Sequence, residues 1–331
     1  MRENRSQPMP VKYWSFAGLM LTDWCNAECD SCYLGCGPGK TDWMATDEAL
    51  RLWRELIDAS PHGCRVHLTG GEPFGRWEQL IAICQAAREQ GLGPLDKVET
   101  NAYWATDDGV IEDRLAALDD AGMDTLMVSA DPYHQQYVPL AQVRRLVACA
   151  RATLGPERVQ VRWEDWLEHG RDTSDMPEAE RAGLLADYVQ AGRERLNGRA
   201  VTTLAHLVEA KPMTAFEGKG CHHPLLRSRH VHVFPGGWIM PGVCAGIMLG
   251  RATVDHSASA VWGALDATFA DRPIVATLAA AGPVALAAMA KTHGYVPLAG
   301  YAGKCHLCWH VREYLFLRGL FLEELGPEGI Y

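Results

Sequence analysis

The feature that most limits the fold of this chain is a strand pattern followed by a helix pattern, repeated five times within residues 15–192. Each unit begins with a short apolar run and continues with apolar residues at helical spacing. The expected strands lie at 15–23, 65–70, 96–101, 124–131 and 158–163, and the helices after them at 47–59, 77–90, 109–122, 140–155 and 179–192. Strands that alternate with helices form a parallel sheet with helices outside it. Such a sheet binds ligands at the carboxyl ends of its strands.

Four cysteines follow the first strand, in the segment "LTDWCNAECDSCYLGCGP". Cys25, Cys29 and Cys32 supply three thiolates, so that a cubane iron–sulfur cluster held there keeps one iron open for another ligand. A structural zinc site is the alternative, but it requires four closed ligands. Cys36 either joins this arrangement or stands outside it. The N-terminus has no apolar segment of signal-peptide length, so we expect a cytoplasmic protein whose clustered cysteines serve a metal or catalysis.

This segment resembles the radical S-adenosylmethionine (SAM) superfamily, in which SAM chelates the open iron. A second motif supports the resemblance, because "TGGEP" follows the second strand, one strand–helix unit after the cysteines. The resemblance implies that Gly70 and Gly71 let the backbone approach the methionine part of SAM. It also implies that Glu72 faces the ammonium group of SAM.

Further polar residues end the third and fourth strands, where superfamily members hold the carboxylate and ribose hydroxyls of SAM. These residues are Thr100, Asn101, Ser129 and Asp131. Their alternative role is to cap the strand ends. Tyr33 is expected to contact adenine, although many members place the aromatic residue just before the third cysteine, where this chain has Ser31. His134 is either a proton-transfer group or a polar pocket residue.

A different pattern begins near residue 200, and we expect a barrel domain at 1–200 and a smaller domain at 201–331. A β-hairpin on a Pro-Gly-Gly turn is expected at 230–243, a helix at roughly 273–291, and a final helix after "AGKCHLCWH". The expected fold class is therefore α/β, with a partial (β/α)6 TIM-like barrel and a small C-terminal domain made of a hairpin and a helix.

Four more cysteines surround the hairpin and precede the last helix, namely Cys221, Cys244, Cys305 and Cys308. They form a closed ligand set for an auxiliary [4Fe–4S] cluster, and a zinc ribbon is the alternative. The arrangement resembles the SPASM or twitch domain of the same superfamily. His222 and His223 are expected to lie outside the ligand set.

Cys244 departs from the pattern of that domain. The resemblance places a ligand at Gly242, counted from Gly237, and Cys244 comes two residues later. In one interpretation the loop bulges and Cys244 still ligates, and in the other Cys244 is a free thiol beside a cluster with three cysteine ligands. We expect ligation.

The longest resemblance is to radical SAM epimerases that act on ribosomal peptides, carried by "CNAECDSCY", "TGGEPF", "TNAYWA", "SADPYHQQYV" and "CHLC". Those enzymes place a ligand cysteine and a hydrogen-donor cysteine side by side on the hairpin, whereas this chain has one cysteine there. If Cys244 ligates, a donor must come from elsewhere or the product is not an epimer. The candidates are Cys36, Cys64, Cys84 and Cys149. Cys84 and Cys149 are expected in helix cores, and Cys36, near the first cluster, is the better reserve donor.

The resemblance implies an oxidoreductase or epimerase that uses SAM, two [4Fe–4S] clusters and an electron donor such as flavodoxin or ferredoxin. A small polyhydroxylated or amino-sugar natural product is the first substrate hypothesis, with dehydrogenation or epimerisation as the reaction. Epimerisation or cross-linking of a ribosomal peptide is the second hypothesis. The small number of residues before the first strand counts against it, because they leave no room for a leader-binding wing. A non-catalytic iron–sulfur or zinc scaffold is the third.

Charge and hydropathy exclude some classes of partner. The chain has 31 basic and 41 acidic residues and a net charge of −10, which disfavours nucleic acid and suits a cationic substrate. No run of about 18 uncharged apolar residues occurs, so no membrane span is expected.

Overall fold

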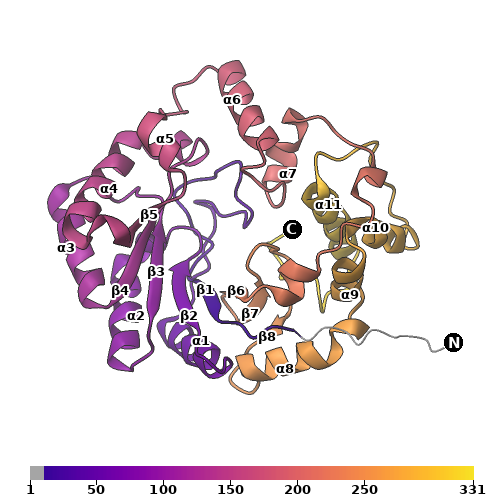
Figure 1. The fold of residues 1–331 in the computed structure, drawn as a ribbon, viewed down its shortest axis with the longest axis horizontal. Coiled ribbons are helices and arrows are strands. Elements are labelled where there is room, and N and C mark those ends of the chain that lie inside the picture. The colour runs from indigo at the N-terminus through magenta and orange to yellow at the C-terminus, as the bar shows by residue number, and fades with distance from the viewer. Residues whose placement is uncertain (1–10) are drawn as a thin grey trace.

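The computed structural model describes residues 11–331, so the expectation about a signal peptide lies largely outside the described residues. All five expected strand–helix units are present (Figure 1). The strands are β1 (Phe16–Met20), β2 (Arg65–Thr69), β3 (Leu95–Thr100), β4 (Met123–Val128) and β5 (Val159–Val161), and the helices that pair with them are α1 (Thr46–Asp58), α2 (Trp77–Glu89), α3 (Asp108–Asp120), α4 (Leu140–Leu154) and α6 (Glu178–Gln190). A short helix that the sequence pattern did not predict, α5 (Glu164–His169), lies between β5 and α6.

The first five strands form one parallel sheet in the order β5-β4-β3-β2-β1. Figure 1 shows α1 to α4 along the outside of this sheet. The apolar stripe of α1 explains its docking, since Ala49, Leu52, Trp53 and Leu56 recur at helical spacing and are completely buried. The predicted α/β class with a partial barrel is therefore confirmed.

The sixth parallel strand of the barrel comes from the part of the chain after residue 200. This strand, β6 (His230–Phe234), pairs with β1 on the side away from β2. It forms the expected hairpin with β7 (Trp238–Pro241), and β8 (Gly250–Arg251) completes an eight-stranded sheet. The hairpin thus continues the barrel sheet, and the division of the chain at residue 200 stays a prediction.

Helices fill the remainder of the C-terminal part. The Ala-rich stretch expected as one helix is two, α9 (Pro273–Ala280) and α10 (Pro283–Lys291), because Gly282 has a φ of +79° and Pro283 begins a new helix. The other helices are α7 (Ala200–Thr203), α8 (Ala258–Thr268) and α11 (Lys304–Leu317). Among residues 11–331, no helix combines the length and the apolar character needed to span a bilayer.

Candidate functional site

A cavity of about 380 Å³ lies over the carboxyl ends of β1 to β5. Most residues predicted for the first site line it, namely Cys25, Cys29, Cys32, Tyr33, Cys36, Gly70, Gly71, Thr100, Asn101, Ser129 and His134. Glu72 and Asp131 are not in its lining and are completely buried. The fold therefore brings the ends of four strands and the cysteine segment to one place.

The two glycines after β2 are required by the close approach of the cysteine segment. A Cβ atom on Gly71 would lie 1.9 Å from the carbonyl oxygen of Trp24, and one on Gly70 would lie 2.4 Å from that of Thr22. The backbone N–H of Gly71 donates to the carbonyl oxygen of Thr22 at 2.7 Å, and that of Glu72 donates to the carbonyl oxygen of Trp24 at 2.8 Å. The glycine motif is thus docked directly on the strand end that leads into the cysteines.

The thiols of the first motif are enclosed and lie close to one another. Burial raises the pKa of Cys25 to about 12, and it raises the pKa of Cys29 well above its usual range. A hydrogen bond from the Cys36 thiol lowers the pKa of Cys32, against the effect of burial. Thiolates in such an enclosed place need a bound cation, so the thiols of Cys25, Cys29 and Cys32 fit a metal cluster.

Arg199 holds the backbone of the cysteine segment, a role that the sequence pattern did not reveal. Its guanidinium donates to the carbonyl oxygens of Cys29 at 3.0 Å and Cys36 at 2.6 Å, and its backbone N–H donates to that of Cys32 at 3.1 Å. The segment after β5 therefore shapes the loop from outside the barrel.

The carboxylate of Glu72 organises the end of β3. It accepts hydrogen bonds from the backbone N–H of Asn101 at 2.6 Å, from the Thr100 hydroxyl at 3.0 Å and from the backbone N–H of Phe74 at 3.2 Å. Burial raises the pKa of Glu72 to about 7. The Asn101 side chain in turn donates to Asn26 at 2.8 Å and approaches the Cys25 sulfur at 3.6 Å. Glu72 is therefore linked through Asn101 to the first cysteine, and its contact with a SAM ammonium stays a prediction.

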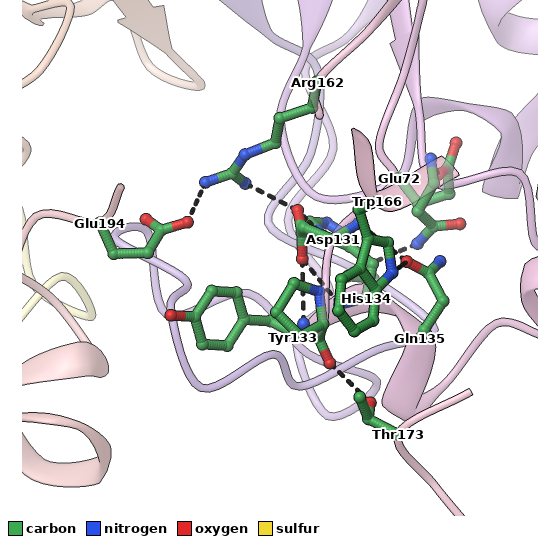
Figure 2. Close-up of polar contacts among 12 residues, drawn as sticks. Glu72, Asp131, Tyr133, His134, Gln135, Arg162, Trp166, Thr173 and Glu194 are labelled. Atoms are coloured by element: carbon green, nitrogen blue, oxygen red, sulfur yellow. Dashed lines mark hydrogen bonds and ion pairs between the residues drawn. The ribbon is translucent and has the colours of Figure 1, made fainter. Parts of the chain in front are cut away.

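A network of charged side chains lies at the ends of β4 and β5 and forms part of the cavity wall (Figure 2). Asp131 accepts from the backbone N–H groups of Tyr133 and His134, both at 3.0 Å, and its other oxygen lies 2.7 Å from His134 Nδ1. Arg162 contacts Asp131 at 3.3 Å and forms a second ion pair with Glu194. Burial alone would raise the pKa of Asp131, but His134 and Arg162 hold it well below its usual range.

Asp131 thus caps the segment that follows β4, while its contact with a ribose hydroxyl stays a prediction. Its contact with Nδ1 holds the ring of His134, which lines the cavity. Arg162 and Glu194 also line the cavity. Neither residue was predicted for the site. The position of Arg162 directly after β5 could have indicated it, because the ends of the neighbouring strands contribute to the same cavity.

The four C-terminal cysteines lie near enough to influence one another's charge, and their role as a second ligand set stays a prediction. Cys305 and Cys308 lie in the first turns of α11. Burial raises the pKa of Cys244 to about 12, and the nearby thiols of Cys308, Cys305 and Cys221 add to this rise against the charge of Arg312. Arg312 is buried, and it donates to the carbonyl oxygen of Ala245 at 2.8 Å.

Residues 19–155 match the family described as the radical SAM superfamily. This range contains the end of β1, all of β2 to β4, the cysteine motif and the glycine motif. Residues 19–155 thus form a radical SAM domain. Enzymes of this superfamily use SAM and a [4Fe–4S] cluster. Among curated proteins, none matches the chain in sequence.

Several solved structures are similar to this chain. BtrN in complex with AdoMet and 2-DOIA is 16% identical over 76% of this chain and 83% of its own, with a TM-score of 0.46. SuiB of Streptococcus suis bound to S-adenosylmethionine is 14% identical over 70% of this chain and 60% of its own, with a TM-score of 0.35. anSMEcpe with bound AdoMet and Cp18Cys peptide is 10% identical over 92% of this chain and 97% of its own, with a TM-score of 0.41.

Proposed function

We propose that this radical SAM enzyme removes a hydrogen atom from a carbon of a small polyhydroxylated or amino-sugar compound and then completes a dehydrogenation or an epimerisation. When bound, the cluster and SAM supply a 5′-deoxyadenosyl radical, which takes the hydrogen atom. The observation that carries the proposal is one cavity lined by the three-cysteine motif, the glycine motif and the ends of β3 and β4.

The protein's own residues would bind and position the reactants. Cys25, Cys29 and Cys32 would hold the first cluster, since their thiols line the cavity together. Gly70 and Gly71 present backbone to the same space without side chains in the way. His134 lines the cavity while Asp131 engages its Nδ1, so its other ring nitrogen is the one available for proton transfer.

The polar side of the cavity supports a substrate rich in hydroxyl or amino groups. Glu99 and Glu194 offer carboxylates, and Arg162 and Arg193 offer guanidinium groups. Hydroxyls and ammonium groups need such partners when they leave water. A ribosomal peptide is the second candidate, which the motif resemblance to peptide epimerases favours.

The two substrate classes are separated by measuring 5′-deoxyadenosine formed by the reconstituted, reduced enzyme with SAM. Flavodoxin or dithionite would serve as electron donor, and aminocyclitols, amino sugars and short peptides would be tested in parallel. We expect stimulation by a sugar, together with a product that lacks two hydrogens or carries one deuterium from heavy water. Stimulation by peptides alone contradicts the sugar proposal, and no SAM cleavage in any reaction favours the scaffold.

We further propose that Cys221, Cys244, Cys305 and Cys308 hold an auxiliary [4Fe–4S] cluster. The mutual effect of these thiols on the pKa of Cys244 supports a common site. Fully reconstituted protein is then expected to hold about eight irons per chain. About four irons with one zinc would assign the second site to zinc instead.

The position of Cys244 supports its role as a ligand rather than a hydrogen donor. Gly242 and Val243 line the cavity beside it, but Cys244 does not, whereas Cys36 does. Cys36 is therefore the candidate donor for an epimerisation. A Cys36→Ser variant that keeps its iron and cleaves SAM, yet no longer incorporates deuterium from heavy water, would support this role, and unchanged incorporation would contradict it.

A further inference from the structure

Three histidines meet inside the barrel, below the cysteine segment and outside the lining of the main cavity. His67 of β2 and His232 of β6 are both in register with Gly18 of β1, the strand between them. His230 lies two residues before His232 and shares its face of the sheet. A Cβ atom on Gly18 would lie 2.5 Å from His67 Nε2 and 2.6 Å from His232 Cδ2, so the glycine makes room for the imidazoles.

The spacing of these imidazoles is close to that of a metal site. One ring nitrogen from each of His67, His230 and His232 lies within 4.8 Å of the other two. Nitrogens bound to one tetrahedral ion at 2.0–2.1 Å are about 3.4 Å apart. Small rotations of the rings would therefore suffice to bring three ligands onto one ion. Within residues 11–331, no other set of three histidines, cysteines or carboxylates is gathered this closely.

The same rings carry polar atoms that have no partner. His67 Nδ1 and His230 Nε2 are buried and make no hydrogen bond, and His67 as a whole is 2% exposed. An unsatisfied buried nitrogen is destabilising, and a bound cation would satisfy it.

Neighbouring groups complete the surroundings expected of a metal site. Oε1 of Glu99 lies 3.7 Å from His67 Nε2, within reach of a fourth ligand position. The Tyr33 hydroxyl is 3.2 Å from His232 Nδ1 and would orient that ring, as outer partners of metal-bound histidines do. Lys97 is a nearby positive charge, which disfavours a bound cation. Its ammonium group lies over the Phe16 ring and pairs with Asp96.

We propose that His67, His230 and His232 bind one divalent transition-metal ion of the class that imidazole favours, with Zn²⁺ as the representative and Glu99 as the fourth ligand. The ion would join β2 to β6 across β1 and so close the lower end of the barrel. Through His232 and Tyr33 it would also support the floor of the main cavity. The three histidines lie outside both cysteine sites, whereas Glu99 and Tyr33 also line the main cavity. The metal site does not depend on the proposed reaction.

Zinc absorption spectroscopy of the holoenzyme tests the site without any substitution. The reconstituted protein would be given one equivalent of Zn²⁺, desalted, and measured at the zinc edge, where iron does not interfere. We expect about one zinc per chain with nitrogen or oxygen ligands at about 2.0 Å and an imidazole outer shell. Loss of the zinc on desalting, or sulfur ligands at about 2.3 Å, would overturn the proposal.

Variants provide an independent test. His67→Phe and His230→Phe should each lower zinc affinity by more than about 100-fold, beyond the effect of losing an outer partner. His293→Phe, at an exposed histidine, is the matched control and should bind zinc as the wild type does. Zn²⁺ should raise the Tm of the wild type and the control but not that of the two variants. Equal affinity or an equal rise in Tm in all four proteins refutes the assignment, and if the variants do not fold, the wild-type spectrum decides alone.

Discussion

Arg162 pairs with two buried carboxylates. Replacing it with Met tests the charge network at the ends of β4 and β5. Arg162 lies 3.3 Å from Asp131 and also pairs with Glu194 (Figure 2). The side chain of Asp131 is completely buried and that of Glu194 is 8% exposed. Met can keep the packing against the Trp163 ring, which Arg162 covers at 5.2 Å, while it removes the charge.

The expected loss of folding stability depends on which hydrogen bonds and ion pairs the two carboxylates still make in the variant. Removing one partner of a buried pair costs about 3–5 kcal/mol, because the other charge stays buried. Asp131 keeps its bonds from Tyr133 and His134, so the cost falls on Glu194 and we expect about 3 kcal/mol at pH 8. For 331 residues the entropy of unfolding is about 0.7 kcal/mol/K, so the Tm should fall by about 4 °C.

The pH dependence of this loss has a definite sign. Burial raises the pKa of Glu194 from 4.5 to about 7, against the opposing effect of Arg162. A raised folded-state pKa means that the stability contributed by the proton is present at acidic pH and is lost as the pH rises through 4.5 to 7. Without Arg162 the pKa rises further, and the loss continues above pH 7. The difference in stability between the variant and the wild type should therefore shrink as the pH falls from 8 to 6.

Thermal unfolding of the reconstituted protein at pH 6 and pH 8 measures both quantities. Arg193→Met is the matched control, since Arg193 also covers the Trp163 ring, at 5.1 Å, but pairs with Asp165 where the two side chains are 36% and 52% exposed. An exposed pair contributes about 0–1 kcal/mol. Equal Tm losses in the two variants, or a loss in Arg162→Met that grows toward pH 6, would refute the reasoning.

Three other variants test the remaining parts of the site. Glu72→Gln should weaken SAM binding by about 1.5–3 kcal/mol with iron content unchanged, because the end of β3 loses its charged acceptor; unchanged affinity in equilibrium binding would separate Glu72 from SAM. Cys244→Ala should lose the auxiliary cluster, and iron analysis that still finds both clusters would make Cys244 the hydrogen donor. Gly71→Ala should lower both iron content and SAM binding, because its Cβ would lie 1.9 Å from the Trp24 carbonyl oxygen. Gly183→Ala, which meets nothing within 4 Å in α6, should change neither, and an equal effect of the two glycine variants would contradict this explanation.

The amino-acid sequence alone determined the parts of this protein that depend on local patterns. Helical and strand periodicities span a few turns or residues, so all five strand–helix units could be predicted close to their observed bounds. The rule that parallel strands share a carboxyl edge then placed the cysteine and glycine motifs on one rim. The motif Cys25, Cys29 and Cys32 also needed no structure, because its ligand spacing lies within one loop.

Only the tertiary structure decided which distant residues meet. Strand pairing across more than 200 residues has no local signal, so the place of β6 beside β1, and with it the gathering of three histidines over Gly18, could not be predicted. The ion pair of Asp131 depends on the tertiary structure in the same way, because its partner, Arg162, directly follows the next strand along the chain. A side chain's function here depends on the side chains around it, and those are set by packing between segments that the sequence keeps far apart.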